Sequence, residues 1–155
     1  MEHAQLIETS AVNYLAGLNT WTQPLLFLAG ESNLDKAEAR IVAYLPEGAF
    51  GEEDPPTSGN RWCDLTFELR TPFSKLTAAQ VAAGAVDPLT QHQNNAAALA
   101  AAVLNVNLPD LLTAAVAGFT CFGLTERTPL RQQDAQFWMS GWKVRLLSCP
   151  SAIAA

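Results

Sequence analysis

Charged residues are scarce in this chain. Asp, Glu, Lys and Arg make up 15% of its 155 residues, against about 25% in an ordinary soluble domain, and 49% of the residues are hydrophobic. This composition excludes a disordered chain, because enough apolar side chains are present to build a core. Two interpretations of the low charge remain open. The chain is either a subunit that buries much of its surface against copies or partners, or a monomer whose hydrophobic fraction is inflated by alanine.

An excess of basic residues is also lacking. Nine Lys and Arg stand against fifteen Asp and Glu, which gives a net charge of −6. This sign argues against non-specific binding to nucleic acid or to an anionic membrane, since both need a positive field. The sequence has no apolar run near the ~18 residues of a membrane span. Its N-terminus, MEHAQLIETS, has no basic region followed by an apolar one, so no signal peptide is visible and we expect synthesis in the cytoplasm.

Cysteines are few and are not paired in sequence. Cys63, Cys121 and Cys149 are widely spaced and form no CxxC pair, the pattern typical of zinc and redox sites. Cys63 and Cys121 lie in apolar runs that resemble strands, where cysteine behaves as a small hydrophobic residue. We therefore interpret them as buried, reduced thiols.

Motifs for catalysis are missing as well. The glycines never fall in a phosphate-binding pattern, and no nucleophile elbow or zinc motif is present. Of the two histidines, His92 belongs to the apolar stripe of an expected helix. We interpret it as a core histidine with one hydrogen bond, the alternative being a base or a ligand. We therefore expect no enzyme activity, no catalytic residue, no cofactor and no metal.

The clearest positive pattern is "GNRWCDLTFELR", residues 59–70, which alternates with period two. This alternation predicts a half-buried strand, because successive side chains leave opposite faces of a sheet. We assign one set to the core: Cys63, Leu65, Phe67 and Leu69. The other set meets solvent or a partner, and it consists of Trp62, Asp64, Thr66, Glu68 and Arg70.

A helix is predicted to begin at Asp87, with Asp as N-cap and Pro88 in the first turn. Apolar residues then recur at spacings of three and four, and this predicts one buried helical face that ends near Asn105 or Asn107. The face comprises Leu89, His92, Ala96, Leu99, Val103 and Val106.

The remaining elements complete an α+β arrangement. We expect a helix over 3–18, a brief strand or packed segment over 24–32, strands over 39–48, 61–71, 119–127 and 135–149, and a short helix after Pro109. This order predicts a mainly antiparallel sheet of about four to five strands, with the N-terminal and central helices packed on one face. We expect a single domain over 1–150, followed by a C-terminal tail over 151–155.

Two groups of charged residues are candidates for contacts. Residues 47–60 are rich in Pro and Gly and are predicted to form a mobile loop. The acids of this loop, Glu47, Glu52, Glu53 and Asp54, either form a solvated face or contact a basic partner. Arg127 and Arg131 are expected to bracket the last hairpin turn. They are either surface charges or pair with acids on another subunit.

The order of these segments resembles the tail-completion (tail-terminator) and neck proteins of tailed bacteriophages. The resemblance is carried by "ARIVAYLPEG", the acidic loop, "GNRWCDLTFELRT", "DPLTQHQNNAAALAAAVL", "FTCFGLTERTP" and "FWMSGWKVRLLSCPS", and it covers about residues 3 to 150. Ala39 stands where a proline is frequent in the family, and residues 72–86 and 108–118 look like additional material.

The resemblance implies a structural virion protein made in the host cytoplasm. Such a protein forms a homo-oligomeric ring, commonly a hexamer, which caps the tail tube and joins it to the head-tail connector in the neck. The implied partners are further copies of the chain, the tail tube protein and the neck proteins. DNA passes through the lumen without sequence-specific binding, and no membrane is involved.

The ring would place contacts at sheet edges and long loops. We name as interface residues Glu47, Glu52, Glu53, Asp54, Asp64, Glu68, Arg70, Arg127 and Arg131. Two alternatives stay open. One is a monomeric α+β ligand-binding or enzymatic domain with a pocket between the helices and the Trp-bearing sheet, and the other is the equivalent subunit of a phage-like injection machine.

Overall fold

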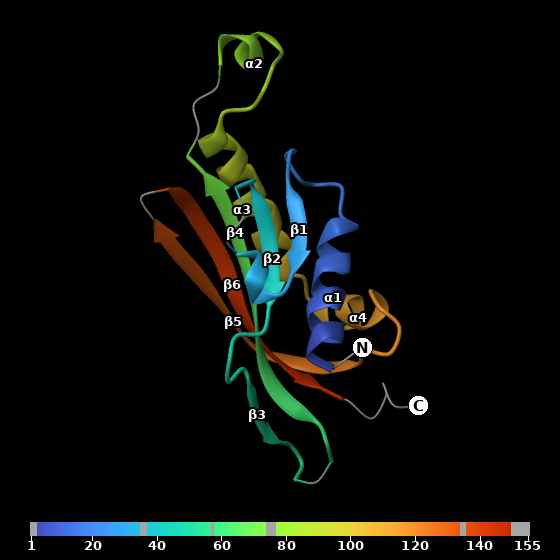
Figure 1. Ribbon diagram of the computed structural model, residues 1–155. Coiled ribbons are helices and arrows are strands. Elements are labelled where there is room, and N and C mark those ends of the chain that lie inside the picture. Colours follow the sequence, from blue (N-terminus) through green and yellow to red (C-terminus); the bar gives the residue numbers. More distant parts are fainter. Residues whose placement is uncertain (1–2, 35–36, 57, 74–76, 134–135, 150–155) are drawn as a thin grey trace.

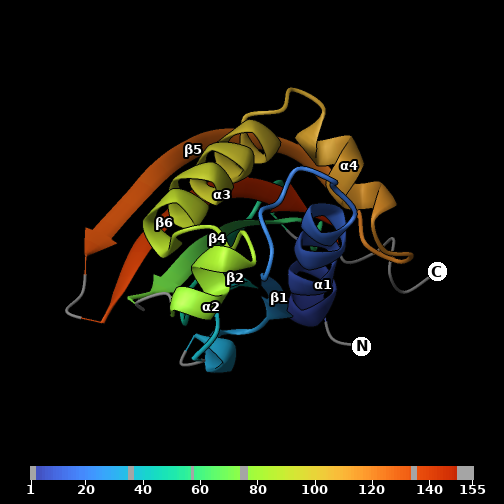
Figure 2. The same ribbon diagram turned by 90° about the horizontal axis from the view of Figure 1, so that it is seen from above.

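A computed structural model describes residues 3–34, 37–56, 58–73, 77–133 and 136–149, so the expected tail at 151–155 lies outside the described residues. Its helices lie on one face of a twisted sheet (Figures 1 and 2). In chain order the elements are α1 (His3–Ala16), β1 (Leu26–Ala29), the 3₁₀ turn η1 (Glu31–Asn33), β2 (Arg40–Tyr44), β3 (Phe50–Glu53), β4 (Arg61–Pro72), α2 (Ala78–Ala82), α3 (Pro88–Val103), α4 (Leu108–Ala114), β5 (Cys121–Gln133) and β6 (Phe137–Ser148).

The sheet has the strand order β1-β2-β4-β6-β5, and β3 pairs with β4 outside this path. Only the β1–β2 pair is parallel among the described strands; the other pairs are antiparallel. The predicted α+β class, with a mainly antiparallel sheet and helices on one face, is confirmed. The sheet has six strands instead of four to five, because the predicted loop contains β3.

The prediction of a mobile loop over 47–60 is wrong for its central part. Phe50 pairs with Cys63 and Glu53 pairs with Arg61, so the segment forms a β-hairpin with the first half of β4. The physical reason is the length of β4. On the edge of β4 away from β6, the strand β2 pairs only as far as Thr66, which leaves the backbone groups at the start of β4 free. The chain that leads into β4 forms hydrogen bonds with these groups.

The turn predicted around "TPLRQQD" is also misplaced. β5 continues through this segment to Gln133, which pairs with Trp138 of β6. Arg127 and Arg131 therefore lie within β5 and do not bracket the turn. Pro129 is tolerated in the strand because β5 is the last strand of the sheet, where a missing N–H facing outward costs no ladder hydrogen bond.

The core lies between the inner face of the sheet and helices α1, α3 and α4. Its strand residues include Cys63, Leu65, Phe67 and Leu69, all at most 1% exposed, as the alternation predicts. Helical residues close the core from above, among them Ile7, Leu15, Leu99, Val103 and Leu112.

α3 begins as predicted, with Asp87 accepting a hydrogen bond from the backbone N–H of Thr90 at 3.2 Å. His92, Leu99 and Val103 are buried. The prediction is wrong at the two ends of the stripe, where Leu89 is 40% and Val106 86% exposed. Val106 lies beyond the end of the helix at Val103, and Leu89 lines an open groove.

α2 stands away from the body of the molecule and buries none of its residues (Figure 1). A capping box between Thr77 and Gln80 closes its first turn.

No single helix in the described ranges is long and apolar enough to cross a membrane. α3 and α4 reach that length and composition only together, across a bend of 95°.

Candidate functional site

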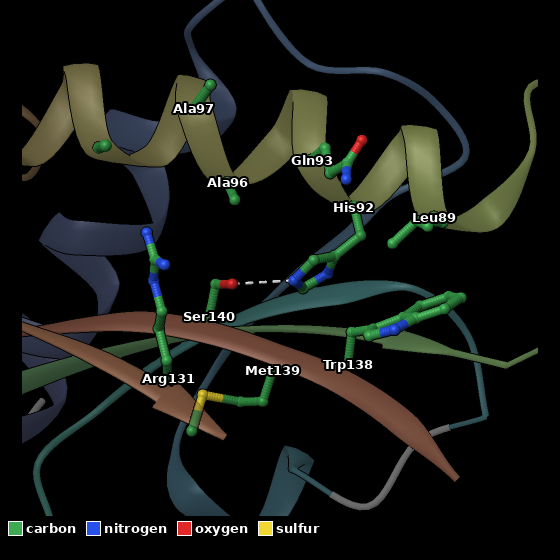
Figure 3. A pocket seen from close by; sticks show the side chains of 10 residues that line it. Leu89, His92, Gln93, Ala96, Ala97, Arg131, Trp138, Met139 and Ser140 are labelled. Carbon is green, nitrogen blue, oxygen red and sulfur yellow. Dashed lines mark hydrogen bonds between the residues drawn. The ribbon is translucent and has the colours of Figure 1, made fainter. Parts of the chain in front are cut away.

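A groove opens between α3 and the projecting β5–β6 hairpin (Figure 3). It encloses about 620 Å³. Small side chains on one face of α3 form its roof, and residues of β5 and β6 form its floor. The lining comprises Leu89, His92, Gln93, Ala96, Ala97 and Ala100 from α3, Arg131 from β5, and Trp138, Met139 and Ser140 from β6.

His92 joins the helix to the sheet at this groove. One ring nitrogen, Nδ1, lies 2.9 Å from the hydroxyl of Thr71, and the other, Nε2, lies 2.9 Å from the hydroxyl of Ser140. The side chain is buried, as the helical pattern predicts, but it makes two hydrogen bonds instead of one. Burial lowers the pKa of His92 below its ordinary value, because desolvation disfavours the charged imidazolium. The imidazole is therefore neutral at pH 7.

The Thr71–His92–Ser140 chain has the elements of an oriented base next to a hydroxyl. Ser140 is half-buried and faces the groove (Figure 3). It lies in the middle of β6, however, with Leu69 of β4 and Arg131 of β5 on either side. Its backbone N–H is thus committed to the sheet and is not free to stabilise an oxyanion. The arrangement can bind a polar group, but the Ser140 N–H does not provide the oxyanion-binding donor that a nucleophilic site needs.

The rim of the groove is aromatic on one side and cationic on the other. The rings of Trp138 and Phe73 meet edge to face at 4.4 Å, and the ring of His92 lies 6.2 Å from that of Trp138. Arg131 rises on the opposite side of Ser140 (Figure 3). An apolar groove with one guanidinium suits an apolar or proline-containing ligand that carries negative charge.

Of the predicted interface residues, Glu68 and Arg70 lie together on the outer face of the sheet. Arg70 donates from Nε to Glu68 at 3.0 Å, and its Nη2 lies 2.9 Å from the same carboxylate. Tyr44 donates its hydroxyl to Glu68 at 2.8 Å, and the guanidinium of Arg70 lies 4.7 Å from the centre of the Phe137 ring. Burial and the Glu68 carboxylate raise the pKa of Tyr44. The charges of Glu68 and Arg70 are thus compensated within the chain.

The acidic residues lie at the β3–β4 end of the molecule. Glu53 forms an ion pair with Arg61 at 3.3 Å, and Asp54 accepts a hydrogen bond from the indole N–H of Trp62 at 3.0 Å. Glu47 and Glu52 are exposed and have no ion pair in the described part of the chain. Asp64, further along β4, lies 3.7 Å from Lys143.

The two predicted arginines of β5 have different surroundings. Arg127 donates to the backbone carbonyl of Asn105 at 3.2 Å, and its buried Nε has no partner within the described ranges. Arg131 is exposed and lines the groove. The nine predicted residues therefore do not form one surface. They divide into an acidic hairpin with Asp64 near it, an internal pair, and two arginines on the last strand.

The sequence interpretation missed the hydrogen-bonded chain in the groove. Thr71 and Ser140 lie on the inner faces of β4 and β6, and His92 lies on the buried face of α3. The two periodicities place each residue on the correct face of its own element. They do not give the strand register that brings all three together.

Metal and thiol chemistry find no support in the described residues. Within those ranges, no three His, Cys, Asp or Glu side chains gather in a way that could hold a metal ion. The three cysteines are buried and unbridged, as expected. Burial raises the pKa of Cys63 to about 12 and that of Cys121 to about 11, so both are protonated at pH 7.

Comparison with protein-family models and with curated proteins finds no match for this chain.

Proposed function

We propose that this protein is the ring-forming subunit of a phage-type tail terminator, a structural protein without enzymatic activity. The observation that carries the proposal is that the chain builds ordered projections which add little to its own core. α2 buries none of its residues, and the β3–β4 hairpin extends from the opposite end of the molecule (Figure 1). Large hydrophobic side chains stay exposed around the fold, namely Leu26, Phe73, Val81, Val86, Leu89, Leu104, Val106 and Phe122. Projections that bury little within their own chain are available for contacts with other molecules, and we take these molecules to be further copies of the chain.

The resemblance noted in the sequence supplies the remainder of the proposal. The ring, commonly hexameric in that family, sits in the virion between the tail tube protein and the neck proteins of the head-tail connector. A ring of identical subunits uses head-to-tail contacts, which join two different surfaces of the same chain. The two unlike ends of this molecule suit such contacts. The net charge of −6 suits a lumen through which DNA slides without being held.

Light scattering after size-exclusion chromatography tests the proposal. The wild-type protein is expected to form one oligomer at high concentration or with tail tubes added. Its measured mass should be a whole-number multiple, greater than one, of the 16.6 kDa chain mass. A monomer under both conditions contradicts the proposal.

The acidic hairpin provides a companion prediction. Replacing Glu52, Glu53 and Asp54 together by Ala is expected to weaken assembly while it lowers the free energy of unfolding by less than about 1 kcal/mol, because the contacts removed, the Glu53–Arg61 ion pair and the Asp54–Trp62 hydrogen bond, lie at the exposed end of the hairpin. The measurements are the assembled fraction and a urea denaturation curve. Unchanged assembly would show that the acids serve only solubility.

A second candidate function rests on the groove. The Thr71–His92–Ser140 chain next to Trp138 is an arrangement that a small polar ligand could use, and it lies between the helices and the Trp-bearing sheet. This candidate predicts a monomer in which small molecules from a screening library change the tryptophan fluorescence, through Trp138 in the groove. The response should be lost in the Ser140→Ala variant.

A further inference from the structure

We propose that the groove between α3 and the β5–β6 hairpin receives the acidic β3–β4 hairpin of a second copy of this chain. The proposal rests on the proposed self-assembly and names the two surfaces that meet. The groove side carries Arg131 and Trp138, and the hairpin side carries Glu52, Pro55 and Pro56.

The groove has the character of an uncovered contact surface. Three alanines along α3 keep its roof low, and these are Ala96, Ala97 and Ala100. Leu89, which lines the groove, is 40% exposed, and Phe73, whose ring packs against that of Trp138, is 38% exposed. A partner that fills the groove would remove this apolar surface from water.

The charges of the two surfaces are opposite. Arg131 is the one charged side chain in the lining of the groove, and it has no ion pair within the described ranges. On the hairpin, Glu47 and Glu52 are exposed and likewise have no cationic partner among the described residues. A guanidinium at the edge of an apolar groove binds a carboxylate through two parallel hydrogen bonds, so Arg131 and Glu52 are a matched pair.

The hairpin also presents the right apolar groups. Pro55 and Pro56 are both exposed at its tip. The tip is held in shape by the hydrogen bond from the backbone N–H of Asp54 to Asn60 at 2.9 Å and by the Trp62 contact with Asp54. Proline rings dock well on aromatic surfaces, and Trp138 with Phe73 provides such a surface at the groove. A hairpin that is already ordered loses little entropy on docking.

The hairpin cannot fill the groove of its own chain. It lies at one end of the molecule, whereas the first turns of α3 and the start of β6 lie towards the other end (Figure 1). A hairpin that docks in the groove therefore belongs to a second copy, and the contact is head-to-tail. Such a contact generates a closed ring when the rotation between copies closes, and an open filament when it does not.

A charge-reversal experiment tests the pairing. Arg131→Glu and Glu52→Arg are each expected to weaken self-association by about tenfold or more, because each turns an attraction into a like-charge contact. The two substitutions combined in one chain restore the attraction and should recover association. Asp110→Arg is the matched control, since it reverses an exposed acid on α4, away from both surfaces. The readout is sedimentation velocity over a concentration series.

Disulfide trapping tests the location directly. Ala96, whose side chain points into the groove (Figure 3), is replaced by Cys in one variant and Glu52 of the hairpin in another, while the native cysteines are buried and unreactive. A mixture of the two single variants should form the mixed dimer on oxidation, and Ala96→Cys mixed with Asp110→Cys should not.

The outcomes separate the pairing from the proposed function. Assembly that persists in Arg131→Glu, together with no mixed disulfide, overturns the docking and leaves the ring intact. A wild-type protein that stays monomeric at every concentration and also with tail tubes added overturns both. A small molecule that co-purifies in the groove of the wild-type protein, detected by native mass spectrometry, also overturns the docking.

Discussion

Gly141 lies in the middle of β6, where the backbone of β4 comes closest. A Cβ atom added at Gly141 would overlap the carbonyl oxygen of Phe67, which is backbone and cannot move aside. Gly141→Ala is therefore expected to lower the free energy of unfolding by at least roughly 1–3 kcal/mol, the range for overpacked interiors. Gly123→Ala in β5 is the control, because an added Cβ there meets no atom within 4 Å. Equal denaturation midpoints for the two variants would refute this close approach.

His92 is expected to make stability depend on pH. Burial lowers the pKa of the folded-state imidazole below 6.5, so the unfolded chain binds a proton more readily than the folded chain. The contribution of His92 to stability is therefore complete above pH 6.5. It is lost as the pH falls from 6.5 through the lower pKa that His92 has in the folded protein. His3 acts in the same direction, and Glu8, whose pKa is raised by burial, acts in the opposite one.

The His92→Gln variant isolates this contribution, because His3 and Glu8 are present in both proteins. The loss of stability between about pH 7 and pH 5 should be smaller in the variant than in the wild type. Urea denaturation at a series of pH values measures the difference. Parallel profiles would mean that His92 titrates alike in the folded and unfolded chains.

At the scale of elements, α3 supplies the sharpest contrast. Leu99 and Val106 were expected on one buried face, but Leu99 is 1% and Val106 86% exposed. Leu99→Asp should unfold the domain, since it places an unpaired charge in the core. Val106→Asp should change the free energy of unfolding by less than about 0.5 kcal/mol, as ordinary surface substitutions do. Circular dichroism with thermal melting distinguishes them, and a folded Leu99→Asp protein would show that the described helix face is wrong.

The elements show what a sequence pattern can predict and where it fails. The alternation of β4 and the Asp87-Pro88 start of α3 are local features, and both are confirmed. β3 and the second half of β5 are strands only because other strands offer free backbone groups beside them. The sequence around Phe50 and around Pro129 reads as loop, since glycine, acids and proline all disfavour an isolated strand. Pairing with the next strand along the chain decided the structure of these segments.

At the scale of the whole molecule, the α+β class and the one-sided helices follow from the order of the elements. The residues that line the groove do not follow, because they come from α3, β5 and β6 and their proximity depends on register. The same holds for Glu68 and Arg70. The alternation places them on the face that meets solvent or a partner, and in the fold they bind each other, while Glu68 also binds Tyr44. Among the predicted contact residues, the exposed ones are Glu47, Glu52, Asp54 and Arg131.

Copies of this chain are proposed to close into a ring, and negative-stain electron microscopy of the wild-type protein, at high concentration and with tail tubes added, shows whether they do. We expect closed rings of one copy number with a central channel in the class averages, and we expect these rings to be lost in the Arg131→Glu variant. Single subunits under both conditions, or open filaments without a closed form, would rule the ring out.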